Sequence, residues 1–554
     1  MEQKLKVFNE YLYENEVRWA DVVYLTQPIN GVRHEITWKE AMFQARKITA
    51  FLKSLGLKKG DKVGILSKNC AEWFIADFAI AMAGFVSVPL YAAQLADTVH
   101  YILDHAEVKA LFVGKLDKWK DQEKGIAENI IRIAFPYEDS MPAKYHWNDL
   151  LDQFEPDMTN YVPDESDLYT IMYTSGTTGA PKGVMITFGA TGHAMEATSK
   201  DATINRLEHH HFLSYLPLGH IFERIVVEHT SLFKKTTIYF VEALSTFTRD
   251  LQYASPTLFV AAPRIWAQFQ KGILAKLSQK KLEILLKIPI LNYFIKKKIK
   301  HGLGFDRTYW CISGSAPMSV PVMEWYQKLG ITICEGYGRT EDLAYATWQY
   351  PEEVIFGTVG KPRPGIEVKL GEDDELLTRS KMMMSGYYKE PGASKEIFTK
   401  DGFIHTGDQA IIHKNGYITI LGRVNDTFKT DKGEFVNPLK LEDKFAENHD
   451  IEQLCAIGLT LPQPVLLVVL SHPALAMHSR QELIAGLKQT MHSINPGLTN
   501  FEKVKRIIVC KDPWTTENDL LTPTFKLKRK AIYNRYIDLA KKVSEIDTEV
   551  YWEA

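Results

Sequence analysis

Apolar positions along the chain follow two alternating patterns. Short, nearly continuous apolar runs occur at residues 62–67 (KVGILS), 109–114 (KALFVG), 236–241 (TTIYFV) and 256–262 (PTLFVAA), and each has the length of a buried strand. Between such runs lie segments in which apolar residues recur at helical spacing, as in 38–56 (WKEAMFQARKITAFLKSLG). Strands that alternate with helices predict an α/β fold with mostly parallel, buried strands.

One apolar stretch, residues 73–93, has the length of a membrane span, which needs about 20 residues. It contains Asp77, Gly84 and Pro89, and the last two interrupt regular structure. We therefore expect a buried helix that runs into a buried strand. The first residues of the chain carry charges throughout and lack the apolar core of a secretory signal, so we expect a cytoplasmic protein.

The chain changes character towards its C-terminal end. Residues 410–421 have the pattern of a hairpin around Asn415-Gly416, a dipeptide typical of a type I′ turn, and a glycine-rich, charged stretch follows. We place a domain boundary there. Residues 1–422 are expected to form a large α/β domain on mixed and parallel sheets with flanking helices, and residues 423–554 a small, mobile α+β lid.

Composition excludes several classes of protein. The hydrophobic fraction of 45% and the charged fraction of 24% are those of an ordinary globular protein. A net charge of -2 gives no general attraction to nucleic acid, so no nucleic-acid partner is expected. The five cysteines form no Cys-x-x-Cys pair, which argues against a disulfide framework or zinc site and favours a reducing compartment.

The stretch 173–187, YTSGTTGAPKGVMIT, predicts a site for phosphate. It continues a strand-like run, and its Gly, Ser and Thr residues can present backbone N–H groups and hydroxyls to one anion, while Lys182 adds a positive charge. The spacing is not that of a P-loop, because Gly183 follows the lysine where that motif has Ser or Thr. Polyphosphate binding by another motif is therefore expected.

This stretch strongly resembles the phosphate loop of the AMP-forming, acyl-adenylating superfamily, which contains acyl-CoA synthetases, luciferases and peptide-synthetase adenylation domains. Further stretches resemble the motifs of that superfamily in the same order along nearly the whole chain. They are YLPLGHIFER (215–224), SGSAPMS (313–319), EGYGRTE (335–341), HTGD (405–408), GRVNDTFKTDKGEFVNP (422–438) and LTPTFKLKR (521–529). Within the superfamily, 260–273 and 521–529 look most like long-chain fatty acyl-CoA synthetases.

The resemblance implies ATP-dependent activation of a long-chain fatty acid as acyl-AMP, transfer to coenzyme A, and release of AMP and pyrophosphate. The substrate carboxylate is itself the nucleophile, so the protein must align two anions and stabilise the charge on the phosphoryl oxygens. By similarity, Lys526 is the catalytic residue that reaches the α-phosphate and the attacking carboxylate. Family members often have Gly just before this lysine, where this chain has Phe525.

The resemblance also implies a nucleotide site. Glu341 resembles the carboxylate that holds Mg²⁺ against the phosphates of ATP, with Thr177 and Thr340 as hydroxyl contacts. Asp408 is expected to accept hydrogen bonds from the ribose, and Tyr337 to stack on adenine. The full ATP and AMP set comprises Thr174, Ser175, Gly176, Thr177, Thr178, Gly179, Lys182, Gly314, Ser315, Ala316, Glu335, Gly336, Tyr337, Gly338, Thr340, Asp408 and Arg423.

Two residues are expected near the acyl group. In the family, the ring that corresponds to His220 lies beside the acyl carboxylate, and an orienting role is expected because that carboxylate has no proton to lose at pH 7. Trp266 resembles the aromatic that gates the acyl tunnel of long-chain enzymes, although a core Trp would look the same. His209, His210 and His211 are consecutive, so they cannot converge on one metal, and we expect a loop there.

For the thioester step, the resemblance implies that the C-terminal lid turns between the two half-reactions. Asn425 is the expected hinge, at a place where the family usually has Asp or Lys. Lys429 and Gly433 are expected to line the arrangement in which coenzyme A attacks.

Residues 271–300 carry nine Lys against one Glu, with Ile and Leu between them. Such a basic, partly amphipathic stretch beside the acyl pocket favours contact with an anionic membrane surface at the inner face, where a long-chain fatty acid partitions. The alternative is a solvated helical hairpin broken at Pro289. An oligomer is compatible with the sequence.

Two other classes of function stay open. A fatty acyl-AMP ligase that loads a carrier protein, or a CoA ligase for another carboxylic acid, would share every nucleotide motif. A catalytically inactive scaffold would be expected to lose Lys526, Glu341 or Asp408, and all three are present.

Overall fold

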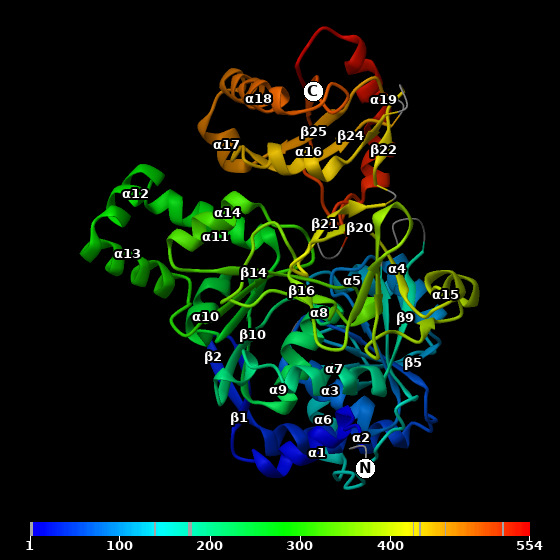
Figure 1. Cartoon of the computed structure of the whole chain (residues 1–554). Helices are drawn as coiled ribbons and strands as arrows, with labels where there is room; N and C mark the ends of the chain where they lie inside the picture. The colour runs from blue at the N-terminus through cyan, green and yellow to red at the C-terminus, as the bar shows by residue number, and fades with distance from the viewer. Residues whose placement is uncertain are drawn as a thin grey trace.

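The computed structural model of the chain describes residues 4–137, 140–174, 180–424, 426–431, 434–459, 461–522 and 526–553. Figure 1 shows a large body, coloured blue to yellow, and a smaller lobe above it that contains the last helices and strands. The N-terminus lies at the far end of the body from this C-terminal lobe.

The largest sheet of the body has eight strands in the order β19-β9-β8-β4-β3-β5-β6-β7. The strands from β8 to β7 pair in parallel, whereas β9 and β19 are antiparallel additions at one edge. The strands are β3 Lys62–Leu66, β4 Val86–Leu90, β5 Val108–Val113, β6 Ile131–Ala134, β7 Tyr145–His146, β8 Leu168–Thr174, β9 Lys182–Thr187 and β19 Gly386–Tyr387. The strands predicted at 62–67 and 109–114 are confirmed as β3 and β5.

The helices beside this sheet follow the predicted pattern. The helix expected at 38–56 is α2 (Trp38–Ser54), and its first turn is closed by a capping box between Thr37 and Glu40. The apolar stretch 73–93 forms the buried helix α3 (Ala71–Met82) and then β4, as predicted. Among the residues described, no helix is long and apolar enough to cross a membrane. The others here are α1 Phe8–Arg18, α4 Ala96–His105, α5 Trp119–Gln122, α6 Trp147–Gln153, α7 Phe188–Ser199 and α15 Pro391–Ile397.

Two more sheets build the second half of the body. One has the order β10-β11-β1-β2 and the other β12-β13-β14-β15-β16. Their strands are β1 Val23–Ile29, β2 Val32–Thr37, β10 His209–Ser214, β11 Lys235–Phe240, β12 Leu258–Ala261, β13 Trp310–Ser313, β14 Ile333–Tyr337, β15 Thr347–Trp348 and β16 Lys361–Pro362. The strands predicted at 236–241 and 256–262 are confirmed as β11 and β12.

The loop expected for the three consecutive histidines is wrong, because they begin strand β10 and pair with β11. A strand turns successive side chains to opposite faces, and each ring has its own partner. His210 binds Thr257 and the carbonyl of Ile204, while His209 binds Thr237.

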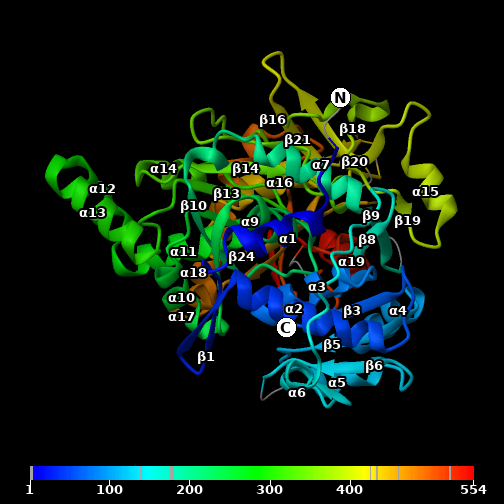
Figure 2. The same ribbon diagram turned by 90° about the horizontal axis from the view of Figure 1, so that it is seen from below.

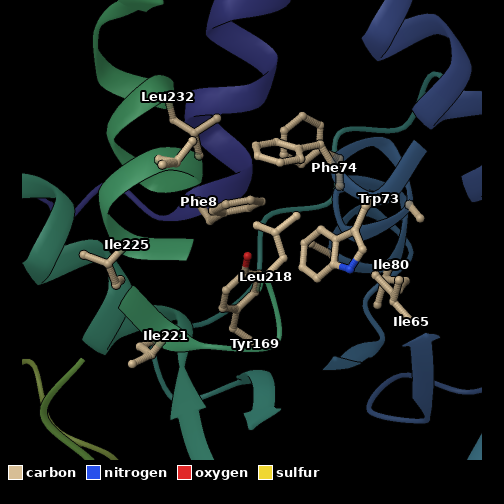
Figure 3. Packing of buried hydrophobic residues seen from close by; sticks show 14 of the residues in the cluster. Phe8, Ile65, Trp73, Phe74, Ile80, Tyr169, Leu218, Ile221, Ile225 and Leu232 are labelled. Atoms are coloured by element: carbon tan, nitrogen blue, oxygen red, sulfur yellow. The ribbon is translucent and has the colours of Figure 1, made fainter. Parts of the chain in front are cut away.

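A single helical segment with an irregular middle follows β10. It consists of α8 (Ile221–Glu223), a π-helical turn (Arg224–His229) and α9 (Thr230–Phe233). Figure 3 shows Ile221, Ile225 and Leu232 of this segment facing the same core as Phe8, Trp73 and Tyr169. The remaining helices of the body are α10 Phe247–Ala254, α11 Pro263–Lys276, α12 Gln279–Lys287, α13 Pro289–Gly302 and α14 Val320–Lys328.

A four-stranded sheet with the order β17-β18-β20-β21 is formed by the part of the chain that precedes the C-terminal lobe. Its strands are β17 Glu367–Leu370, β18 Glu375–Arg379, β20 Ile404–Ile412 and β21 Ile418–Arg423, so the hairpin predicted at 410–421 is confirmed. The prediction of a type I′ turn at Asn415-Gly416 is wrong. The N–H of Gly416 donates to the carbonyl of His413, and of the turn residues only Gly416 has positive φ, at +83°. A type I′ turn would need two such residues.

The C-terminal lobe has its own sheet in the order β24-β25-β26-β27 with helices on it. Its elements are β22 Phe428–Lys429, β23 Phe435–Val436, α16 Pro438–Phe445, β24 Ile451–Ile457, β25 Val465–Leu470, α17 His472–Met477, α18 Arg480–Ile494, β26 Arg506–Val509, α19 Arg529–Glu545 and β27 Val550–Trp552. Apolar residues fill both faces of this sheet. The exact domain boundary at 422/423 stays a prediction.

Candidate active site

The glycine-rich stretch connects two antiparallel neighbours in the large sheet. The strand expected before it is β8, and Thr174 at its end pairs with Lys182 at the start of β9. Both residues therefore stand at the base of the connection. Ser175, Gly176, Thr177, Thr178 and Gly179, which make up most of the predicted phosphate loop, lie outside the residues that the structure describes.

A tyrosine links the base of this loop to the predicted metal-binding carboxylate. The Nζ atom of Lys182 lies 5.1 Å from the centroid of the Tyr387 ring, and the Tyr387 hydroxyl donates to Oε1 of Glu341 at 2.8 Å. The N–H of Met384 also donates to the carbonyl of Glu341 at 2.9 Å. Lys182 and Tyr387 come together because β9 and β19 pair, and Glu341 joins them from the turn after β14, which belongs to another sheet.

The walls predicted for the adenine slot lie at the ends of two parallel strands. Ser313 of β13 pairs with Glu335 of β14, so Gly314, Ser315 and Ala316 lie at the same sheet edge as Gly336 and Tyr337. Carboxyl ends of parallel strands are the usual ligand edge of an α/β sheet.

Three of these positions are sterically restricted. A Cβ atom on Gly314 would lie 3.2 Å from the Phe222 ring, and one on Gly338 would lie 2.4 Å from the backbone of Ala344. Gly338 is therefore a position that only glycine fills without backbone movement. Ser315 has a φ of +71°, in the left-handed region that few non-glycine residues adopt.

Glu335 is buried at this edge, where its Oε1 accepts from the N–H of Met318 at 3.1 Å. Burial raises the pKa of the Glu335 carboxyl to about 7. The backbone N–H of Glu335 donates to the side-chain oxygen of Gln349. Hydrogen bonds that involve the side chains of Glu335 and Gln349 therefore fix this end of β14.

Asp408 and Arg423 lie opposite each other on β20 and β21. Oδ1 of Asp408 is 3.0 Å from Nε of Arg423, and Oδ2 accepts from the Tyr337 hydroxyl at 2.6 Å. The structure therefore brings together three residues predicted for the nucleotide site. Each carboxylate oxygen has a second lone pair, so Asp408 can still accept from a sugar hydroxyl.

Arg339 joins the two motifs that carry Asp408 and Glu341. Its Nη1 donates to the carbonyls of His405 and Thr406, and its backbone N–H donates to Asp342 at 2.6 Å. Thr340 lies in the same short turn and is buried. Arg339 was not among the predicted site residues, although it lies within the motif 335–341.

His220 ends the loop between β10 and the irregular helical segment. Its Nδ1 accepts from the N–H of Phe222 at 3.2 Å, so the ring caps that segment. Burial and the positive charge of Lys526 lower the pKa of the His220 ring to about 3. The ring is neutral at pH 7, and because Nδ1 accepts, its proton is on Nε2, which can donate to a ligand.

Buried polar groups hold the His220 loop in place. Nδ2 of Asn69 donates to the carbonyl of Leu216 at 2.7 Å, and Oε1 of Glu223 accepts from Ser214 Oγ at 2.8 Å and from Tyr215 N–H at 3.1 Å. Burial raises the pKa of the Glu223 carboxyl to about 8. These contacts were not predicted, because Asn69 is 147 residues from Leu216 and no local pattern shows that Glu223 turns back to Ser214 and Tyr215.

A buried ion network lies under β8 and the π-helical turn. The Arg224 side chain has no exposed surface; it pairs with Asp77 at 2.5 Å and with Glu228 at 3.1 Å, and donates to Thr170 at 3.0 Å. Tyr169 joins both Arg224 and Asp77. The network connects α3, β8 and the helical segment that follows His220.

Lys526 reaches the site from the C-terminal lobe. Its backbone N–H donates to Thr522 Oγ1 at 3.0 Å, and the Thr522 N–H donates to the carbonyl of Lys526 at 2.8 Å. Lys526 is an exposed residue, and its ammonium lies near the charges of Arg423, Asp408 and Glu341. Partial desolvation by the surrounding protein lowers the pKa of this ammonium, as does the charge of Arg423, while Asp408 and Glu341 act in the opposite direction.

Two exposed ion pairs also join the lobe to the body. Lys118 is 3.0 Å from Glu517, and Arg264 is 2.7 Å from Glu452. The side chains of all four residues are at least 36% exposed, so water and salt screen both pairs.

The remaining predicted residues are placed as follows. Trp266 of α11 is fully buried; its ring packs against Phe259, Phe305 and Tyr326, and its carbonyl accepts from the Tyr326 hydroxyl at 2.6 Å. Lys429 lies in β22, and nothing is described of its side chain. Asn425 and Gly433 lie outside the described residues.

A hollow of about 1020 Å³ lies elsewhere in the body, along α7 and the segments 348–353, 361–367 and 379–382. None of the predicted site residues lines it. The motif residues thus converge at a different place, between the sheet edges and the C-terminal lobe.

Models of two protein families match this chain. The model described as AMP-binding enzyme matches residues 13–388, and the model described as AMP-binding enzyme C-terminal domain matches residues 425–545. Together the two matches cover most of the sequence.

Individual proteins match over similar lengths. Fatty acyl-CoA synthetase A of Dictyostelium discoideum is 30% identical over 572 residues, which cover 90% of this chain and 84% of that protein. Long-chain-fatty-acid–CoA ligase FadD15 of Mycobacterium bovis is 28% identical, with 95% of each covered. The adenylation domain of a carboxylic acid reductase from Segniliparus rugosus, solved with AMP and a co-purified carboxylic acid, superposes with a TM-score of 0.78 at 19% identity, covering 98% of this chain and 94% of that one. This last likeness concerns the fold.

Proposed function

This chain belongs to the AMP-binding enzyme family, and on that premise we propose that it is a long-chain fatty acid–CoA ligase. It would activate the fatty acid with ATP as acyl-AMP and transfer the acyl group to coenzyme A, with release of pyrophosphate and AMP. Relatives named as fatty acyl-CoA synthetases and long-chain ligases support the substrate class. The observation that carries the proposal is the convergence of Lys526 with His220, Glu341 and Asp408 from different parts of the chain.

In the first step, Lys526 would stabilise the negative charge where the two anionic substrates meet. A carboxylate and the α-phosphate of ATP repel each other, so a cation between them lowers the barrier to attack. The location of Lys526 at the edge of the lobe, facing the charges of Asp408 and Glu341, supports this role. Catalysis here needs a charge and an alignment rather than a protein nucleophile.

His220 would orient the acyl carboxylate. The lowered pKa keeps the ring neutral at pH 7, and Nε2 is the nitrogen left to donate, since Nδ1 accepts from Phe222. A neutral donor can fix one carboxylate oxygen without reducing the nucleophilicity of the other as strongly as a cation would. A role as general base is disfavoured, because the substrate acid is already ionised.

The nucleotide would lie between the phosphate-loop hairpin and the two sheet edges. The phosphates would be held by Thr174, Lys182 and the loop 175–179. The ribose would be held by Asp408 and Arg423. The adenine slot would be formed by residues 314–316 and 335–338. Partners already present at Asp408 and Arg423 support a fixed ribose position.

The residues at Glu341 suit Mg²⁺. One oxygen of the Glu341 carboxylate accepts from Tyr387, and within the described residues the other has no partner. Magnesium prefers a small number of carboxylate ligands and completes its shell with water and phosphate oxygens. Glu341 would hold the ion, with Thr177 and Thr340 nearby, and the ion when bound would neutralise phosphate charge.

The thioester step would require movement of the C-terminal lobe. We propose a boundary after residue 422, with residues 1–422 binding ATP and the acyl group and residues 423–554 as the lid. Asn425 would be the hinge, and Lys429 and Gly433 would line the arrangement in which coenzyme A attacks acyl-AMP. Exposed rather than buried ion pairs between lobe and body support such movement.

Trp266 would border the acyl chain. Its position on α11 in an aromatic cluster supports a wall for an apolar ligand. The proposal also includes a peripheral location at the inner membrane face, with contact through residues 271–300, because long-chain fatty acids partition into bilayers.

The test is release of AMP and pyrophosphate by the purified full chain. ATP, Mg²⁺ and saturated acids from butyrate to arachidate would be supplied, with and without coenzyme A. We expect AMP and acyl-CoA to peak between laurate and stearate. A peak at short or aromatic acids would instead assign a CoA ligase for another acid, and pyrophosphate exchange without acyl-CoA would assign an acyl-AMP ligase. Absence of both products with every acid would refute the family-level activity.

A further inference from the structure

The segment that carries Lys526 is closed at its base by backbone contacts. An antiparallel bridge joins Leu521 to Leu527, and the N–H of Lys528 donates to the carbonyl of Leu520 at 2.9 Å. The two leucines at 520 and 521 are buried in the apolar cluster that also contains the inner face of α19. The base of the segment is therefore fixed within the lobe, directly before α19 begins.

Arg529 is the first residue of α19 and lies three positions after Lys526. Its Nη1 and Nη2 atoms donate to the two carboxylate oxygens of Glu442 in α16, at 2.7 and 2.5 Å, and its Nε lies 3.2 Å from Oδ2 of Asp426. A planar guanidinium that holds a carboxylate by two parallel bonds fixes direction as well as distance. The side chains of Arg529, Asp426 and Glu442 are 18%, 24% and 9% exposed, so water screens these contacts less than the exposed pairs between lobe and body.

Asp426 connects this network to the proposed hinge and to the ribose side of the site. It comes directly after Asn425 in the sequence, and its backbone N–H donates to the carbonyl of Arg423 at 3.1 Å. Arg423 in turn is paired with Asp408. Burial raises the pKa of the Asp426 carboxyl, while the charges of Arg529 and Arg423 act in the opposite direction, so this carboxyl lies near both arginines.

The position of Arg529 is not explained by the stability of its own helix. Figure 1 shows α19, drawn in red, with one end towards the body, and in Figure 2, seen from below, this helix lies behind the middle of the body. A cation at the first position of a helix opposes the helix dipole, and the first turn of α19 contains no acidic residue. The carboxylates that hold Arg529 come instead from α16 and from the residue after the hinge. The contacts thus join three separate parts of the lobe.

We propose that Arg529 is a positioning residue for Lys526, because it ties the segment that carries this lysine to Asp426 beside the hinge and to α16. These parts then turn as one unit, and the angle at the hinge sets where the Lys526 ammonium lies. The inference rests on the role proposed above for Lys526 and on the proposed turn of the lobe. Arg529 touches no substrate and acts only through the lysine. A misplacement of about 1 Å at a reacting centre costs on the order of 10²-fold in rate, so such an anchor matters for adenylate formation.

The first experiment measures the two half-reactions of the full chain separately. Arg529→Ala should slow pyrophosphate release with ATP, Mg²⁺ and the preferred acid by about 10–100-fold. Transfer from supplied acyl-AMP to coenzyme A should fall by less than about threefold, because that step does not use Lys526. Arg535→Ala, at an exposed arginine of the same helix, is the matched control and should behave as wild type. A loss of equal size in both half-reactions would show general support of the lobe and would overturn the proposal.

A double-mutant cycle separates action through Lys526 from action on the whole lobe. If Arg529 acts through the lysine, adding Arg529→Ala to Lys526→Ala should change the residual rate of adenylate formation by less than about twofold. If the two losses multiply instead, the proposal is wrong. Asp426→Asn provides the same test should Arg529→Ala not accumulate as folded protein, because it keeps both bonds between Arg529 and Glu442. It should slow adenylate formation several-fold and add nothing to Lys526→Ala.

Amide hydrogen exchange gives a readout that needs no turnover. Arg529→Ala should speed exchange in peptides that cover residues 520–528, where the N–H groups of Thr522 and Lys528 are bonded within the segment. Peptides from β25 should exchange as in wild type, and Arg535→Ala should change neither region. Unchanged exchange at 520–528 would overturn the anchoring role. If the wild-type chain forms no acyl-AMP from any acid, the ligase proposal fails, and the exchange result alone then decides whether Arg529 holds the segment.

Discussion

Arg224 and Lys526 are both cations close to the predicted reaction centre, but their surroundings differ. Arg224 is enclosed in the body, with Asp77, Glu228 and Thr170 as partners and no exposed surface. Lys526 lies in the C-terminal lobe beside an antiparallel bridge between Leu521 and Leu527, and the ion pairs described above between lobe and body are exposed. We therefore expect the body to form a fixed half of the site, and the lobe a half that can move away without breaking a core.

The comparison predicts that changes in the two halves fail in different ways. Removing a partner from the buried network should lower the free energy of unfolding, whereas removing the lobe's lysine should leave the fold unchanged and affect one half-reaction. The following experiments test this difference.

The largest effect is expected for Asp77→Ala. The change leaves the Arg224 guanidinium buried with less compensation, which costs about 3–5 kcal/mol in comparable cases. Chemical denaturation should show this loss, or the variant should fail to accumulate as folded protein. Asp117→Ala, at a residue whose side chain is 74% exposed, is the control and should change stability by less than about 0.5 kcal/mol. Equal stability of the two variants would remove the basis for the comparison.

Lys526→Ala should reduce formation of acyl-AMP by about 10²–10³-fold, the usual loss when one group that stabilises transition-state charge is removed. The melting temperature should not change. Transfer of the acyl group from supplied acyl-AMP to coenzyme A should continue. Lys530→Ala, four residues on and exposed, is the matched control and should behave as wild type. Similar damage to both half-reactions would contradict the role proposed for Lys526.

Tyr387→Phe tests the link between the phosphate loop and Glu341. The change removes a hydrogen bond to a carboxylate and keeps the ring beneath Lys182, so about a tenfold loss in the rate of adenylate formation is expected. The Mg²⁺ concentration that gives half-maximal rate should rise as well. The control is Tyr388→Phe, whose hydroxyl donates to Glu107 at the surface. An unchanged dependence on Mg²⁺ would separate Tyr387 from the metal site.

Glu223→Gln tests the fixed half through pH. The folded-state pKa of Glu223 is raised to about 8, so the folded protein binds a proton between the ordinary carboxyl pKa and pH 8 that the unfolded chain has lost. Stability from this group is present below the ordinary pKa and falls as pH rises towards 8. The Gln variant should flatten that decline in denaturation measured from pH 5 to pH 8. Glu324→Gln, at an exposed position, should leave the slope unchanged.

The smallest effect is expected at the exposed contacts of the lobe. Glu517→Gln and Glu452→Gln each remove one screened ion pair, which contributes at most about 1 kcal/mol. The ratio of the adenylate-forming rate to the thioester-forming rate should shift by less than about fivefold, in favour of the thioester step, and only at low salt. A larger shift that persists at high salt would mean that the lobe is held more firmly than the exposed pairs indicate.

Local patterns were sufficient for much of the fold. The apolar stretch 73–93 formed α3 and β4 because Gly84 and Pro89 interrupt it, and the alternation of 410–421 formed the hairpin of β20 and β21. Both predictions depend on neighbours in the sequence. The turn type was wrong because a type I′ turn needs a positive φ at Asn415 as well as at Gly416, and only Gly416 has one.

Contacts between distant residues were not predictable in the same way. Tyr387 reaches Glu341 only because β19 pairs with β9, about 200 residues earlier in the chain, and no local period records that pairing. The histidines at 209–211 lie in β10 because this strand pairs with β11, whereas a loop was expected because consecutive histidines cannot converge on one metal. Arg339 was visible within a recognised motif, but its bonds to the carbonyls of His405 and Thr406 depend on how two motifs meet.

The π-helical turn at Arg224–His229 has a consequence for insertions and deletions. A π turn contains more residues than an α turn, so it shifts the rotational phase of the helix on either side. Refolding of the same residues as regular α-helix would rotate the two ends relative to each other by about 100°, and either His220 and Arg224 or the far end, where Asn15 donates to the carbonyl of Leu232, would lose its register. Deletion of Val226 would instead remove the extra residue, so a regular α-helix could form with both ends close to their present angular positions. The irregular turn lets one helix satisfy two sets of neighbours whose angular positions a regular helix of the same length cannot match.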